Sequence, residues 1–182
     1  DAVSIGNRHS YIFGNLRRSF SPTSGTYNLP VGTATAYRLA QVVNHSLTGV
    51  SFLEARFTDT FSNTGLLNPV SASDLGTAYI AVAPEGIWHI SPNLPPTGGA
   101  YTIRLWFDGG GASAFSNISD NRFGVLRRPG GATTASSWSG ASGGGTLSPE
   151  SSPGRTLAGG FASRNNLQAF SEFAIAFSDS PL

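Results

Sequence analysis

The 182-residue sequence contains no Cys, no Met and no Lys, so all 11 of its basic residues are Arg. The absence of Cys excludes disulfides, zinc–thiolate sites and thiol nucleophiles. The absence of Lys excludes Schiff-base chemistry, the P-loop lysine and lysine-derived crosslinks. Because no Met begins the chain, we expect it to be a mature or excised piece of an exported, processed precursor.

Charge is scarce as well, since only 12% of the residues are charged, against about a quarter in typical proteins. A net charge of +1 provides no basic field for nucleic acid, so no nucleic-acid partner is expected. No apolar run approaches the roughly 20 residues of a membrane-spanning helix. The weakly charged, Ser/Thr/Gly-rich composition instead favours an extracellular or cell-surface protein.

Strands are the predicted secondary structure, because 23 Gly and 11 Pro leave few windows for a long helix. The clearest strand is Tyr101–Phe107, in which Tyr101, Ile103 and Leu105 point inward and Trp106 points outward. Val50–Thr58 and Phe170–Phe177 alternate in the same way. Shorter strands are predicted at Tyr11–Gly14, Thr77–Ala83, Gly86–Ser91, Arg122–Arg128 and Arg155–Ser163.

The spacing of these strands predicts a single antiparallel β-sandwich with a jelly-roll-like arrangement. Thr33–Thr48 fits helical spacing or a strand, and its residue types favour a strand. Pro84–Gly86 is predicted to form a hairpin turn between two apolar runs. The Gly/Ser-rich segment 130–154 is predicted to be a long loop within the domain, because residues 155–182 are too few for a core of their own.

Catalytic motifs have little support. Gly140–Gly144 matches G-x-S-x-G around Ser142, but a nucleophile elbow needs a helix after the serine and none is predicted there. A glycosidase needs two facing carboxylates, and no sequence spacing favours a pair such as Glu54 and Glu172. We therefore predict that the chain is not an enzyme.

Metal sites are equally unsupported by spacing. The three histidines, His9, His45 and His89, lie far apart and form no metal-binding motif. Calcium remains open, because Asp108 and Asp120 lie in expected turns, although no D-x-D-x-D run accompanies them. The prediction is therefore no cofactor, with calcium as an alternative.

Aromatic and arginine side chains are the candidate ligand-binding groups. Trp88, Trp106 and Trp138 could stack on sugar rings, and Trp106 is the best candidate because it points outward. Alternatively, these rings are covered by the fold or by a neighbouring subunit. Arg127 and Arg128, like the Arg17–Arg18 pair, could dock a partner's carboxylates, or they could satisfy nearby acids.

Three stretches resemble the extracellular β-rich regions of Bacteroidota proteins exported by the type IX secretion system. They are Gly25–Thr33 with Ala36–Arg38, Glu85–Pro92 with Tyr101–Phe107, and Phe170–Ala176. Ala176 stands where that family usually has glycine, and the chain stops at Leu182, where such proteins commonly continue into a sorting domain. The resemblance implies an exported structural or adhesive module, favours a strand at Thr33–Thr48 and transfers no catalytic residue.

Together these features predict a non-catalytic structural or adhesive module of a secreted or cell-surface protein, including a subunit of a surface filament. Its expected partners are other protein domains or copies of itself. Residues Asp1–Ser24 precede the resemblance and are predicted to be an N-terminal extension or an exchangeable strand. The alternative is a carbohydrate-binding module that uses exposed aromatics to hold a polysaccharide.

Overall fold

The computed structural model describes residues 10–74, 77–106, 123–140 and 161–178, and these ranges form two β-sheets packed face to face. The first sheet has five strands in the order β1-β3-β4-β10-β12. They are Ile12–Phe13 (β1), Gly25–Gly32 (β3), Tyr37–Asn44 (β4), Tyr101–Trp106 (β10) and Phe161–Leu167 (β12). All pairs in this sheet are antiparallel except β1 with β3.

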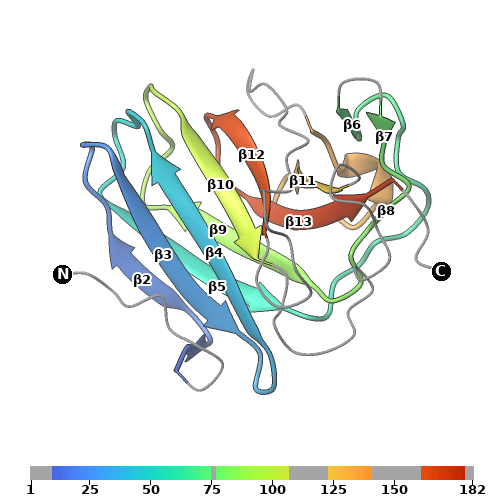
Figure 1. Cartoon of the computed structure of the whole chain (residues 1–182), viewed down its shortest axis with the longest axis horizontal. Coiled ribbons are helices and arrows are strands. Elements are labelled where there is room, and N and C mark those ends of the chain that lie inside the picture. Colours follow the sequence, from blue (N-terminus) through green and yellow to red (C-terminus); the bar gives the residue numbers. More distant parts are fainter. Residues whose placement is uncertain (1–9, 75–76, 107–122, 141–160, 179–182) are drawn as a thin grey trace.

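The second sheet has the order β11-β13-β9-β5-β2, with β8 also paired to β13. Its strands are Leu16–Ser19 (β2), Phe52–Thr58 (β5), Ala81–Val82 (β8), Ile87–Pro92 (β9), Phe123–Arg128 (β11) and Glu172–Phe177 (β13). Ser73–Asp74 (β6) and Thr77–Ala78 (β7) pair separately. Figure 1 shows the two layers, with β3, β4 and β10 in one and β2, β5 and β9 in the other. The predicted antiparallel β-sandwich is therefore confirmed.

The main core lies between the sheets and follows the predicted alternation. Ile103 and Leu105 of β10 face Leu53 and Phe57 of β5 across a cluster of buried apolar side chains. Burying such side chains is the dominant favourable contribution to folding, at about 25 cal/mol per Å² of apolar surface. Because the residues between them point the other way, the same alternation sets the outer face of each sheet.

A second, smaller core covers part of the outer face of the six-stranded sheet. It contains Ile87, Leu126 and Ala174 from the strands and Trp138 from the segment after β11. The strand β13 is consequently buried along its whole length, on both faces. The first part of the predicted 130–154 loop is thus packed structure, including a short 3₁₀ helix, η2 (Ala135–Ser137).

Several predictions need correction. The Pro84–Gly86 break is not a hairpin: β8 and β9 do not pair with each other, and both pair antiparallel with β13. The chain therefore continues in one direction past the break. Gly86 has φ +137°, and a Cβ there would lie 2.3 Å from the Thr58 carbonyl oxygen, so the backbone angle and the close packing both require glycine at this position.

Strand positions also differ in detail from the sequence patterns. The segment Thr33–Thr48 contributes a strand, β4, as its residue types favoured. Three strands had no prediction from alternation: the edge strand β2, the two-residue β6 and the eight-residue β3, whose Pro30 and terminal glycines obscure its pattern. Residues 107, 122 and 155–160 of the predicted strands lie outside the described ranges.

Candidate functional site

The outer face of the five-stranded sheet combines aromatic rings, amides and one arginine. We call it the polar–aromatic face and define it by Asn28, Gln41, Arg104, Trp106 and Phe161. Strand register brings these residues together from four strands: Asn28 pairs with Gln41, Gln41 with Arg104, and Trp106 with Phe161. All five lie on the opposite side of their strands from the main core.

The aromatic part of this face is a contact between β10 and β12. The rings of Trp106 and Phe161 have their centroids 4.8 Å apart and are tilted by 54°. The guanidinium carbon of Arg104 lies 5.1 Å from the Phe161 centroid, within cation–π range. Both rings are half-buried, and the buried indole Nε1 of Trp106 has no hydrogen-bond acceptor within the described ranges.

The polar part centres on Gln41, which is 8% exposed. Its Nε2 donates to Asn28 Oδ1 at 2.7 Å, while its carbonyl oxygen Oε1 is buried with no donor. An unsatisfied buried polar atom costs about 1–3 kcal/mol. Gln41 Oε1 and Trp106 Nε1 are thus two buried polar atoms without a hydrogen-bond partner among the described residues.

Polar side chains continue along one side of the face. His45 Nε2 lies 2.9 Å from Thr102 Oγ1, and the Thr102 hydroxyl donates to Asn165 Oδ1 at 3.1 Å. At the start of β4, Tyr37 lies against the ring of Tyr11, 5.6 Å away, and burial raises the pKa of Tyr37 to about 12. The Thr102 hydroxyl is neutral, and the Tyr37 hydroxyl stays protonated near neutral pH, so both suit recognition of hydroxyl groups.

Of the predicted tryptophans, only Trp106 lies on the outer face of a sheet and outside both core clusters formed by the described residues. Trp88 lies in the main core, where its Nε1 donates to the Arg38 carbonyl at 3.2 Å. Trp138 is fully buried in the smaller core, and its Nε1 donates to Asn63 Oδ1 at 2.9 Å. Neither Trp88 nor Trp138 presents a ring to a ligand, because both are fixed by packing and by a hydrogen bond.

The two predicted arginines, Arg127 and Arg128, point in opposite directions. Arg128 is buried: its Nε donates to Glu172 Oε2 at 2.7 Å, and its guanidinium carbon lies 4.5 Å from the Trp138 ring centroid. Arg127 has a 3.4 Å hydrogen bond from Nη1 to the Phe170 carbonyl and a buried Nε without an acceptor. Arg128 therefore stabilises the fold, and the two side chains cannot act as one carboxylate clamp.

The candidate catalytic carboxylates have separate structural partners. Glu54 binds Arg17, while Glu172 binds Arg128 and accepts from the Gly131 backbone N–H at 3.0 Å. Within the described ranges, no three acidic or histidine side chains gather closely enough to hold a metal ion. Ser142, His9, Asp108 and Asp120 lie outside the described residues.

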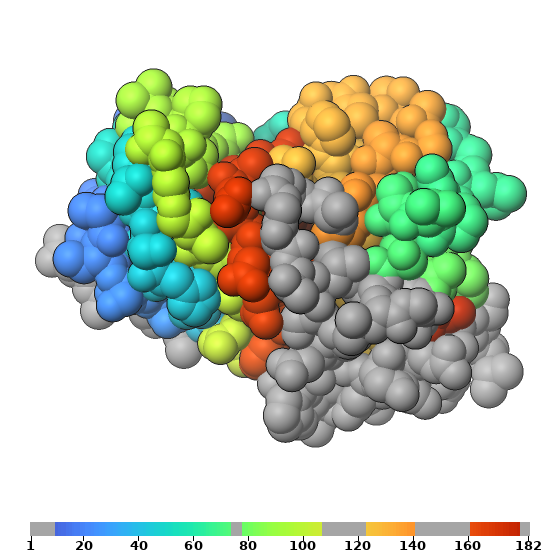
Figure 2. All heavy atoms as spheres, turned by 90° about the horizontal axis from the view of Figure 1, so that it is seen from above, coloured from blue at the N-terminus to red at the C-terminus, as the bar shows by residue number. Residues whose placement is uncertain are grey.

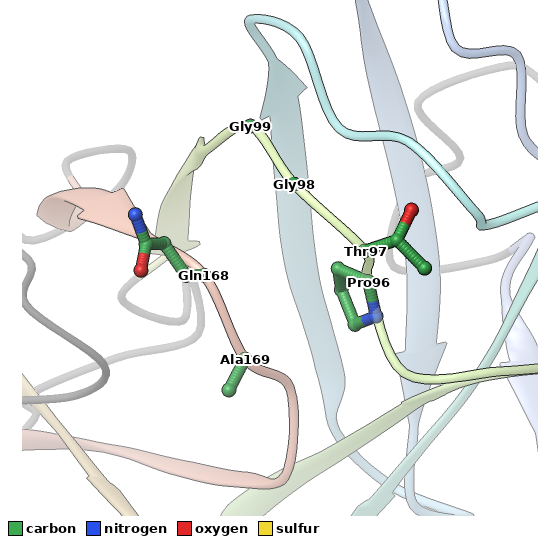
Figure 3. A pocket seen from close by; sticks show the side chains of 6 residues that line it. All are labelled: Pro96, Thr97, Gly98, Gly99, Gln168 and Ala169. Carbon is green, nitrogen blue, oxygen red and sulfur yellow. The ribbon is translucent and has the colours of Figure 1, made fainter.

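A hollow of about 340 Å³ opens at one end of the sandwich. Figure 2 shows a notch between the yellow-green atoms around the β9–β10 connection and the orange atoms of residues 123–140. The hollow is lined by Pro96, Thr97, Gly98, Gly99, Gln168 and Ala169. Figure 3 shows Gln168 and Ala169 on one side, facing the 96–99 segment on the other. Its lining contains no charged group and no aromatic ring, so we place the site on the polar–aromatic face.

Comparison with known proteins gives no family: no family model, no curated protein and no solved structure matches this chain. No helix within the described ranges is long and apolar enough to cross a membrane.

The tryptophan of the site was predictable from the sequence, but its partners were not. Alternation along Tyr101–Phe107 placed Trp106 outward, whereas Gln41 and Phe161 join it through strand register. The signal for Gln41 was a lone amide between apolar residues in β4, and recognising it required knowing which face of that strand is buried.

Proposed function

We propose that this chain is a non-catalytic adhesive module of a secreted or cell-surface protein, and that it binds polysaccharide on the polar–aromatic face. The observation that carries the proposal is the pair of half-buried rings, Trp106 and Phe161, with the Arg104 guanidinium beside them on an outer sheet face. Sugars offer hydroxyl groups that donate and accept, together with C–H faces that pack on aromatic rings. A polysaccharide therefore matches both parts of the face.

Affinity electrophoresis through gels containing different soluble polysaccharides tests this proposal. The parent chain should be retarded by at least one polysaccharide, and Trp106→Ala should lose the retardation because the stacking ring is removed. Gln41→Met, which keeps the side-chain length but removes the hydrogen bond that positions the Asn28 amide, should weaken retention.

The matched control is Phe13→Ala, because Phe13 is an aromatic side chain that is 72% exposed on β1, outside this face. Phe13→Ala should migrate like the parent. Equal retardation of Trp106→Ala and the parent in every gel would overturn the proposal. Circular dichroism of each variant separates lost binding from lost folding.

A second candidate function, assembly with copies of itself, is favoured by the path of residues 12–19. Ile12 and Phe13 pair with β3 in the five-stranded sheet, whereas β2 pairs with β5 in the other sheet. The crossing occurs at Gly14, which has φ +120°. One short segment thus closes an edge of each sheet, and such a segment can be exchanged for that of another copy.

Light scattering and electron microscopy test this second function. If assembly uses strand exchange, the full chain should form dimers or filaments at high concentration, and deleting residues 1–24 should abolish them. A full chain that stays monomeric up to its solubility limit rules assembly out, whatever the folding of the shortened variant.

A further inference from the structure

We infer that the polysaccharide held on the polar–aromatic face is anionic and that Arg104 contacts its carboxylate or sulfate groups. This inference rests on the proposed function and adds the class of ligand. It follows from the lack of acidic residues in the strands around Arg104, together with the position of Arg104 beside the aromatic rings.

The strands of the five-stranded sheet contain three arginines and no Asp or Glu. Two of these arginines are turned toward the inside of the sandwich: Arg38 lies over the Phe57 ring at 5.5 Å, and fully buried Arg164 donates to the Val125 carbonyl. Arg104 lies on the outer face, between Gln41 and Ser163 in strand register. Among the described residues, no carboxylate lies within 4.0 Å of its guanidinium.

The strands of the six-stranded sheet contain five arginines and two carboxylates, and each carboxylate is paired with an arginine. Arg17 binds Glu54 at 2.6 Å, and Arg128 binds Glu172 at 2.7 Å. The outer face of the five-stranded sheet therefore presents a positive charge with no acid in its own strands to balance it. An anionic ligand would supply that balance, and guanidinium binds carboxylate and sulfate oxygens through two parallel hydrogen bonds.

The spacing along β10 suits one sugar unit with an acidic substituent. Arg104 and Trp106 are two residues apart on the same face, which separates them by roughly 7 Å in an extended strand. A pyranose ring packed on Trp106 can therefore place a ring substituent at the Arg104 guanidinium.

The test compares ligands that differ only in charge. Affinity electrophoresis is run with polygalacturonate against its fully methyl-esterified form, and with dextran sulfate against dextran. We expect retardation by polygalacturonate and none by its ester. Retardation by dextran sulfate as well would show that the site also binds sulfate. Retardation by polygalacturonate alone would show that the site is specific for carboxylate.

Equal retardation by each charged polymer and its neutral counterpart would overturn the anionic ligand while leaving polysaccharide binding intact. Absence of retardation by any polysaccharide, neutral or charged, would overturn the proposed function itself. The two failures are therefore distinguishable in one set of gels.

Variants separate a specific contact from general charge attraction. Arg104→Gln should weaken binding to polygalacturonate by about tenfold or more, because hydrogen bonds to charged groups contribute more than neutral ones. The matched control is Arg56→Gln, which removes the same charge from an exposed position on β5 of the other sheet. It should bind like the parent. Equal loss in both variants would show attraction by net charge alone and would overturn the assignment of Arg104.

Discussion

At the scale of single residues, Gly99 sets the shape of the hollow at the end of the sandwich. Its φ is +79°, and a Cβ there would lie 1.9 Å from the Ser46 carbonyl oxygen. Gly65 has a similar φ of +86° but open space around the position of a Cβ. Alanine substitution at Gly65 therefore tests the effect of the left-handed backbone alone, whereas substitution at Gly99 adds a steric clash.

We expect Gly65→Ala to lower the free energy of unfolding by about 1–2 kcal/mol, through backbone strain alone. Gly99→Ala should lower it by about 1–3 kcal/mol more, because the backbone must also move away from Ser46. Urea denaturation followed by tryptophan fluorescence measures both. Equal losses in the two variants would show that the 46–47 segment moves freely to make room.

The positions of the three tryptophans in the structure show which orientations can be predicted from residue patterns. Alternation fixed the orientation of Trp106, because every second residue around it is apolar. Trp88 directly follows Ile87 and both side chains become buried, so this stretch does not alternate between buried and exposed residues. Trp138 lies among Gly, Ser and Thr, and its burial depends on packing against strands distant in sequence.

At the scale of elements, the pair β11–β13 contains the most deeply buried ion pair among the described residues. The side chains of Arg128 and Glu172 are 3% and 8% exposed. Arg128 also donates to the Ser62 carbonyl at 2.7 Å, which ties the segment before β6 to this strand pair. The ion pair thus links the smaller core to the sheet that it covers.

We expect Glu172→Gln to reduce the free energy of unfolding by about 3–5 kcal/mol, because it leaves the Arg128 charge buried without a counter-charge. Glu54→Gln is the control, since the Arg17–Glu54 pair is exposed and worth no more than about 1 kcal/mol. Chemical denaturation of both variants tests the contrast. A loss for Glu172→Gln as small as that for Glu54→Gln would mean that water reaches Arg128.

Element prediction succeeded where alternation was long and failed where the chain is irregular. The strands β5 and β10 lie within one or two residues of their predicted positions. The predicted hairpin between β8 and β9 was wrong, because Pro and Gly indicate a break in a strand but not whether the chain reverses direction there. Only pairing with β13, more than 80 residues away in sequence, decides that it continues.

At the scale of the whole molecule, the chain alternates between the two sheets. It crosses from β4 to β5, back from β9 to β10, and again on the way to β11, β12 and β13. Most contacts in the core therefore join residues distant in sequence. Local patterns predicted the sandwich class, whereas strand order and the composition of the polar–aromatic face depend on these long-range pairings.

One charged row spans four strands of the six-stranded sheet and makes overall stability depend on pH. In register, Arg56 pairs with His89, His89 with Glu172, and Glu172 with Arg128. His89 Nε2 also lies 2.9 Å from Thr58 Oγ1, and its Nδ1 lies 3.4 Å from Glu172 Oε1. Desolvation lowers the pKa of His89 below its usual value, as do the charges of Arg56 and Arg128, whereas Glu172 opposes this shift.

Because the folded protein binds this proton less readily than the unfolded chain, its stability should fall as pH drops below about 6.5, the ordinary pKa of histidine. The loss should be complete once pH passes below the pKa of His89 in the folded state, and this contribution should be constant above about pH 7.5. Urea denaturation between pH 8 and pH 5.5 measures it. His89→Gln should flatten the dependence, and Arg56→Gln should reduce it by removing a nearby positive charge. An unchanged pH dependence in His89→Gln would assign the titration to another group.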